Sequence, residues 1–290
     1  MNFGTNYLNT WPACWKALAM TDNAFKNAVQ QFNLERLLTC MFSGFLIGLA
    51  SGLLGVGGGE FRIPVLLYLL QTPVLLSIVT NLFIGLLTVS VSFTVRYQAG
   101  LITFSAINMG LLMSSGSIIG GYIGANLSGK INESLLRKFL ILLLIAAGLR
   151  MVLDPLIEWE PLSIPLTHPM ETFLSILVGL LIGIVSGLLG VAGGEYRIPA
   201  LIYLFGLPVK TAGTVSLLVS IPTILAGFMK HWRIGHLNNY GVAVGLTMGS
   251  ASVVGSYIGA SFVTAASEGF LKMLLGIVLL LATVRMITKP

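Results

Sequence analysis

The feature that most constrains this chain is an 18-residue stretch that occurs twice. The first copy, Ser51–Tyr68, reads SGLLGVGGGEFRIPVLLY, and the second, Ser186–Tyr203, reads SGLLGVAGGEYRIPALIY; 14 of the 18 aligned positions are identical. Each copy places a glycine run, a glutamate, an arginine and a proline among strongly apolar residues. Charged side chains and helix breakers are costly inside a membrane, and there they usually mark a substrate or ion site. The repeated stretch is therefore the first candidate for a functional site.

Composition places the whole chain in a membrane. Of its 290 residues, 56% are hydrophobic and 9% are charged, whereas a soluble domain carries about 25% charged residues. Several apolar runs approach the roughly 20 residues that a spanning helix needs. The runs are continuous, without the alternation typical of a membrane β-barrel. We therefore expect an all-α polytopic membrane protein.

Other function classes find little support. The formal net charge is +6, but the basic residues are dispersed among apolar segments, so nucleic acid is not an expected partner. Cys14 and Cys40 lie in no CxxC pair, which predicts no metal site. The glycine run follows a membrane segment instead of a β-strand, so no nucleotide cofactor is expected. The expected partners are a small anionic solute, the lipid bilayer and, in a homodimer, a second copy of the chain.

The duplication extends well beyond the motif. Gly58 corresponds to Gly193 and Arg150 to Arg285, each at an offset of 135 residues. A constant offset predicts two homologous helical repeats, with broken or re-entrant helices at the glycine-rich motifs. The expected organisation is an N-terminal amphipathic or interfacial segment (1–35), a first transmembrane repeat (36–153), a linker (154–170) and a second transmembrane repeat (171–290).

Apolar runs in the first repeat predict helices over residues 37–54, 63–70, 74–95 and 104–127, and a fifth that ends near Arg150. Gly116, Gly120 and Gly124 are spaced as in small-residue contacts between membrane helices.

The orientation of the repeats follows from how often each crosses the membrane. If the helices beside the glycine run form a hairpin, the repeats are inverted; if they form one broken helix, the repeats are parallel. With a cytoplasmic N-terminus, and with the motif residues Arg62 and Arg197 left out of the count, the inverted scheme places Arg96, Arg150, Lys210 and Lys272 outside and ten basic residues inside. The parallel scheme gives nine inside and five outside. The positive-inside rule therefore favours inverted repeats.

The motif has the chemistry of an anion site. Glycines allow an unwound backbone whose N–H groups point into a cavity, and Pro64 and Pro199 suit the first turn of a following helix. Arginine can bind an oxyanion through two parallel hydrogen bonds. The expected substrate-binding residues are Gly57, Gly58, Gly59, Arg62, Asn81, Gly193, Gly194, Arg197 and Ser216.

Glu60 and Glu195 allow two interpretations. Each glutamate can pair with an arginine of its own or the opposite half and so lower the free-energy cost of burying the arginine's charge. Alternatively, the glutamates are protonatable groups that couple anion movement to a proton gradient.

The paired segments GLLGVGGG and GLLGVAGG, each followed by Ile-Pro, resemble the TauE/SafE (sulfite exporter) family of membrane permeases, as does Ala212–Leu217. The resemblance covers nearly the whole chain from Leu37. It implies a carrier for small sulfur-containing anions, such as sulfite or organosulfur acids, in a prokaryotic inner membrane.

The leading hypothesis is thus a secondary transporter that works by alternating access. An anion channel and an integral-membrane enzyme acting on a lipid head group are the alternatives. The enzyme is disfavoured because the sequence lacks the histidine- or carboxylate-rich clusters that such chemistry needs.

Overall fold

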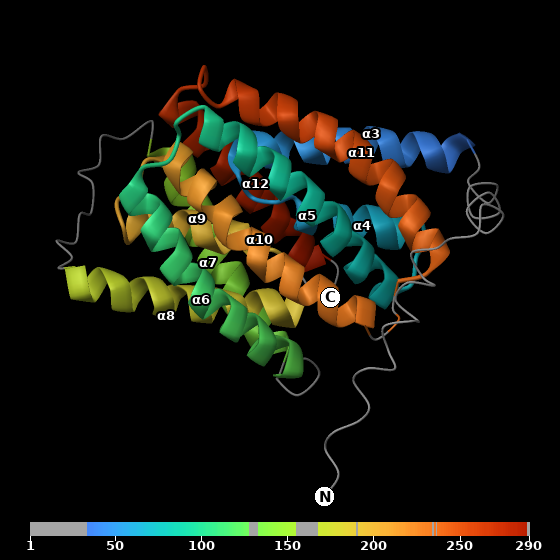
Figure 1. Cartoon of the computed structure of the whole chain (residues 1–290), viewed down its shortest axis with the longest axis horizontal. Coiled ribbons are helices and arrows are strands. Elements are labelled where there is room, and N and C mark those ends of the chain that lie inside the picture. Colours follow the sequence, from blue (N-terminus) through green and yellow to red (C-terminus); the bar gives the residue numbers. More distant parts are fainter. Residues whose placement is uncertain are drawn as a thin grey trace, which may run out of the picture.

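The computed structural model describes residues 34–127, 133–154, 168–189, 191–233, 235 and 237–288. Within these ranges the secondary structure is helical, and no strand occurs. The predicted N-terminal segment (1–35) and linker (154–170) lie almost wholly outside them. The expected all-helical membrane fold is confirmed (Figure 1).

The two halves contribute matching series of helices. The helices α4, α5, α6 and α7 begin 135 residues before α9, α10, α11 and α12, so the offset read from the sequence holds for these four pairs. The first half contains α3 (Leu34–Leu54), α4 (Gly59–Pro64), the π-helix η1 (Val65–Leu69), α5 (Val74–Gln98), α6 (Phe104–Leu127) and α7 (Glu133–Leu153). The second contains α8 (His168–Leu189), α9 (Gly194–Tyr203), α10 (Val209–Arg233), α11 (Asn239–Phe262) and α12 (Glu268–Thr288).

Among the described residues, six helices are long and apolar enough to cross a membrane: α3, α5, α6, α8, α10 and α11. Large apolar side chains lie exposed on the outer surface, including Phe42, Leu142 and Phe173, each about two-thirds exposed. A surface of this kind is suited to lipid. The chain is therefore a multi-pass membrane protein.

The predicted helix breaks lie at the glycine motifs. α3 ends at Leu54, and α4 begins after four intervening residues, among them Gly57 and Gly58 with φ of +96° and +75°. Only glycine adopts such angles without strain. The second half repeats this start, with Gly193 at φ +72° directly before α9.

The position expected for the two prolines is wrong. Because the left-handed glycines start the helices early, Pro64 and Pro199 lie in the second turn instead of the first. A proline there donates no backbone hydrogen bond. The two halves then differ: α4 gives way to the π-helix η1, whereas α9 continues to Tyr203 as one helix.

The halves exchange helices. α3 packs against α11 of the second half, and α8 packs against α6 of the first. A Cβ atom on Gly48 would lie 2.2 Å from the Ser252 carbonyl oxygen, and one on Gly120 would lie 2.1 Å from that of Leu180. The predicted small-residue contacts are therefore confirmed, with the partner helix always in the other half.

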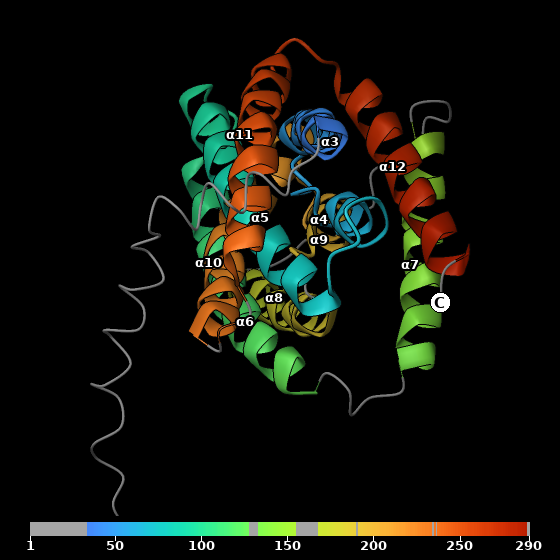
Figure 2. The same ribbon diagram turned by 90° about the vertical axis from the view of Figure 1, so that its right-hand side faces the viewer.

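Figure 2 places the helices in three groups. The helices α5, α6, α10 and α11 form one side, and α7 and α12 form the other. The short helices α4 and α9 lie between them, beside α3 and α8. Both motif arginines are therefore carried by elements in the middle of the molecule.

Candidate functional site

The two glycine motifs meet in the interior. A Cβ on Gly194 would lie 2.2 Å from the carbonyl oxygen of Val56, and one on Gly57 would lie 3.2 Å from Cβ of Ala192. These contacts join the start of α9 to the loop before α4. The motifs of both halves therefore form one site.

Arg62 is fully buried and reaches from α4 to α5. Its Nη1 donates a hydrogen bond to Oδ1 of Asn81 at 3.0 Å. Its Nη2 lies 3.4–3.5 Å from three neutral acceptors, the Gly57 carbonyl and the hydroxyls of Thr88 and Ser252. Hydrogen bonds of that length are weak. One end of the guanidinium is thus firmly held and the other loosely held.

Arg197 is also fully buried, but both of its terminal nitrogens make shorter bonds. Nη1 donates to the Ser216 carbonyl at 3.0 Å and to the Ser220 hydroxyl at 2.9 Å. Nη2 donates to the Ala192 carbonyl at 3.2 Å. These contacts tie α9 to α10 and to the loop before α9.

A small cavity lies beside Arg62. Its water-accessible volume is about 10 Å³, enough for about one water molecule. None of the lining residues is acidic, and they come from both halves: Gly57, Gly59, Arg62, Asn81, Leu82, Gly85, Ala192 and Ile224.

The remaining residues expected at the site have other positions. Gly58 and Gly193 precede α4 and α9 as left-handed caps. Gly194 lies against the Val56 carbonyl. Ser216 contributes its carbonyl to Arg197, and its buried hydroxyl has no hydrogen-bond partner among the described residues.

The two motif glutamates interact with each other. The carboxyl of Glu195 is 2% exposed, and it interacts electrostatically with the Glu60 carboxyl of the other half. A proton on either carboxyl group would let that group donate to the other, because a carboxylate only accepts. Glu195 forms no ion pair with any described residue, although Arg197 acts on it electrostatically.

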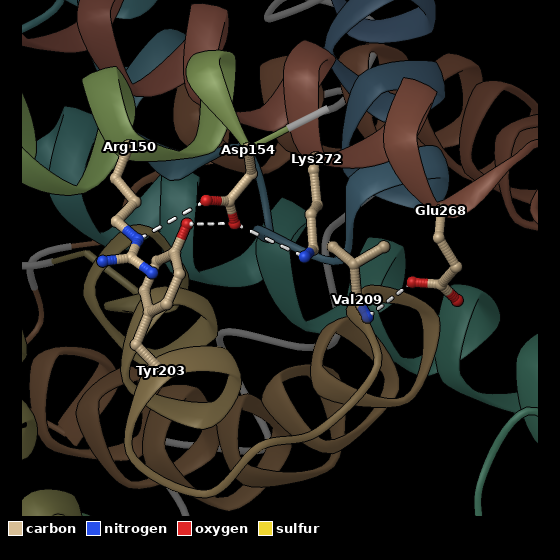
Figure 3. A network of polar contacts seen from close by, with 6 residues as sticks. All are labelled: Arg150, Asp154, Tyr203, Val209, Glu268 and Lys272. Carbon is tan, nitrogen blue, oxygen red and sulfur yellow. Dashed lines mark hydrogen bonds and ion pairs between the residues drawn. The ribbon is translucent and has the colours of Figure 1, made fainter. Parts of the chain in front are cut away.

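A second polar network lies where α7, α9, α10 and α12 come together (Figure 3). Asp154 lies 3.4 Å from both Arg150 and Lys272 and accepts a hydrogen bond from the Tyr203 hydroxyl at 3.1 Å. The Arg150 guanidinium lies over the Tyr203 ring. Beside them, the backbone N–H that opens α10 donates to Glu268 at 2.8 Å. The network fastens the α7–α12 pair to the ends of α9 and α10.

Comparison with known families decides the identity. The family described as "Sulfite exporter TauE/SafE" matches residues 13–151 and 174–290, which is most of the chain. The chain belongs to the TauE/SafE family. The resemblance seen in the glycine motifs is therefore confirmed.

Several TauE/SafE relatives are similar along much of their length. A probable membrane transporter protein of Xylella fastidiosa (strain Temecula1) is 28% identical over 271 residues, 88% of this chain and 97% of the relative. MJ0441 of Methanocaldococcus jannaschii is 26% identical over 252 residues, 81% of this chain and 90% of the relative. YunE of Bacillus subtilis is 26% identical over 219 residues, 67% of this chain and 78% of the relative. Both are also described as probable membrane transporter proteins. No solved structure matches the chain.

Nothing in the sequence indicated the role of Arg96 in this TauE/SafE chain. The helix predicted over 74–95 stops just before Arg96, which enters the charge count only as a basic residue outside the membrane, but α5 continues to Gln98 and Arg96 is 1% exposed. Its guanidinium donates to the carbonyls of Gly52 and Leu53 at 2.9–3.1 Å. Arg96 thereby satisfies the last turn of α3. Position 231 of the other repeat is histidine, so the duplication gave no signal for this role.

Proposed function

We propose that this TauE/SafE protein is a secondary transporter that moves a small sulfur-containing anion across the cytoplasmic membrane of a prokaryote. Sulfite, a sulfonate or a related organosulfur acid fits the proposal. The observation that carries it is the cavity beside fully buried Arg62, which has no acidic lining residue and is built by both halves. A guanidinium in such a setting favours an oxyanion.

Alternating access is supported by the difference between equivalent positions of the two halves. Val74 is 60% exposed, whereas the equivalent Val209 is 4% exposed. Likewise Tyr68 is 52% exposed, whereas Tyr203 is partly buried and bonded to Asp154. In a protein built from two related halves, such a difference is expected when one end is closed and the other is open.

An inverted arrangement of the repeats is supported by contacts among basic residues that the two topologies place differently. The parallel scheme would put Arg96 and Arg150 on the membrane face opposite Lys210 and Lys272. Yet Arg96 donates to the carbonyl of Lys210 at 3.3 Å, and Arg150 and Lys272 share Asp154. In Figure 1, α3 and α8 also run in opposite directions. The proposed topology therefore has inverted repeats and a cytoplasmic N-terminus.

Proton coupling is the proposed role of Glu60 and Glu195. Their carboxyl groups are neighbours across the two halves, and the charged or titratable groups that act on them are Arg62, Arg197 and Tyr196. A proton shared by such a pair can leave when the halves separate. An anion channel is the weaker candidate, because a cavity with room for about one water molecule is no open pore.

Reconstituted protein tests the proposal. Proteoliposomes loaded with unlabelled sulfite should take up radiolabelled sulfite by counterflow, and uptake should saturate. Taurine, sulfoacetate, thiosulfate, sulfate and acetate added as competitors would define the substrate class. Ohmic, non-saturating sulfite current would reject the transporter in favour of a channel, and no flux of any sulfur anion would reject the proposed substrates.

A further inference from the structure

The residues that surround the motif arginine differ between the two halves. Gly85 of α5 lies one turn beyond Asn81, and its equivalent in α10 is Ser220. The Ser220 hydroxyl accepts a hydrogen bond from Nη1 of Arg197 at 2.9 Å. Gly85 has no side chain to offer Arg62, and the space that a side chain would occupy belongs to the cavity.

The hydrogen bonds of the arginines differ accordingly. Arg197 makes three bonds of 2.9–3.2 Å. Arg62 makes one bond of 3.0 Å, and its other three contacts are 3.4–3.5 Å long. A guanidinium that is already well bonded has little to gain from a ligand, whereas a loosely bonded one gains strong charge-assisted bonds.

The neighbours of Arg62 point to the class of ligand. The Asn81 amide carbonyl already accepts from Arg62, and the amide nitrogen of Asn81 lies 3.1 Å from the position of a Cβ on Gly59. The cavity therefore presents a guanidinium and an amide N–H group, both of which are donors. A compact oxyanion, which has only acceptors, complements this set.

We propose that the substrate site is asymmetric: Arg62 binds the oxyanion in the space left by Gly85, while Arg197 is a positioning residue whose two terminal nitrogens are held by Ser216, Ser220 and Ala192. This inference rests on the proposed function and refines it. One oxygen of the anion takes the cavity beside Arg62, and the rest of the anion enters when the halves move apart.

The Gly85→Ser variant tests the inference, because it gives the first half the residue that the second half already has. A Cβ at position 85 would lie 3.6 Å from both Arg62 Nη1 and Ile224 Cδ1, which is ordinary contact, so the fold should be kept. The added hydroxyl would fill the cavity and bond Arg62. We expect sulfite affinity to fall by about tenfold or more.

Gly121→Ser is the matched control. Its equivalent in the second half is Ser256, and a Cβ there would meet its nearest neighbours at 3.8–3.9 Å. Sulfite binding is measured from the shift in melting temperature of detergent-purified protein across a sulfite titration. The control should bind sulfite like the wild-type chain, and Gly85→Ala, which lacks the hydroxyl, covers the case in which the serine variant does not fold.

Unchanged sulfite affinity in a folded Gly85→Ser or Gly85→Ala variant would overturn the asymmetric site while leaving the transporter proposal standing. Failure of the wild-type chain to bind sulfite or any other sulfur oxyanion would overturn both. Loss of binding in the position-85 variants, with the Gly121→Ser control intact, supports the assignment.

Discussion

At the scale of single residues, identical side chains have different surroundings. Arg62 and Arg197 occupy equivalent positions in nearly identical motifs, and both are fully buried. Asn81 binds Arg62 through its side chain, whereas Ser216 binds Arg197 through its carbonyl. Their neighbours in α5 and α10 thus determine how many donors each arginine has left for a ligand.

Replacing each arginine by alanine should separate the two roles. Arg197→Ala removes three hydrogen bonds of 2.9–3.2 Å from a charged donor, and each such bond contributes about 1.5–3 kcal/mol. We expect this variant to melt at a lower temperature than Arg62→Ala, whose lost bonds are longer. Arg62→Ala should instead lose the stabilisation by sulfite. Thermal melts with and without sulfite measure both effects, and equal behaviour of the two variants would contradict the assignment.

The glutamate pair gives a prediction about coupling. Glu195→Gln keeps a polar group next to Glu60, but the glutamine amide cannot take up and release a proton as a carboxyl group does. Sulfite uptake driven by a sulfite gradient should persist in proteoliposomes, and uptake driven by an imposed pH gradient should fall to background. Glu171→Gln, the same change in the first turn of α8, is the control. Full pH-driven uptake by Glu195→Gln would exclude this glutamate from coupling.

At the scale of helices, glycine fixes which surfaces meet. The contacts of α3 with α11 and of α8 with α6 bring backbones so close that a methyl group does not fit. Without a hydrophobic drive between helices in lipid, such close packing is a main source of association. The small-residue faces therefore determine the architecture around the site.

Two alanine substitutions test this packing. On Gly120 a Cβ would lie 2.1 Å from a backbone oxygen of α8, whereas on Gly227 the nearest atom would be a leucine methyl at 3.5 Å. Gly120→Ala should reduce the yield of folded protein and lower its melting temperature. Gly227→Ala should leave stability unchanged or raise it, since alanine favours a helix by about 1 kcal/mol over glycine. Equal melting temperatures would show that the α6–α8 contact adapts.

Much of the helical organisation could be predicted from the sequence. The repeat offset, the break at the glycines and the bounds of α6 follow from periodicity and composition. The exchange of helices between halves could not be predicted, since Gly48 and Gly120 show that a close contact exists but not with which helix. The burial of Arg96 was also hidden, because its acceptors are carbonyls of α3, 43 and 44 residues away along the chain.

At the scale of the whole molecule, the two ends differ. The Asp154 network holds the α7–α12 pair against α9 and α10 at one end, where Val209 is buried (Figure 3). At the equivalent position of the first half, Val74 is exposed. In the proposed transport cycle, the end near Val209 would open while the end near Val74 closes.

Thiol labelling can follow that exchange. In a background without Cys14 and Cys40, the Val74→Cys thiol should react readily with a membrane-impermeant maleimide, and the Val209→Cys thiol should react slowly. Adding Asp154→Asn weakens the contacts to Arg150 and Lys272, so labelling at position 209 should become several-fold faster. An unchanged rate at position 209 would mean that the network does not hold this end closed.

The pairing of α3 with α11 also sets conditions on biosynthesis. α3 is the first of the described helices to be made, yet the helix that covers its glycine face, α11, is the last but one of them. Until α11 is made, the glycine-lined surface of α3 lacks its partner helix and has to be covered by lipid, by the insertion machinery or by a chaperone. A chain that is terminated before α11 is therefore released with this surface of α3 exposed, and quality-control proteases can recognise it.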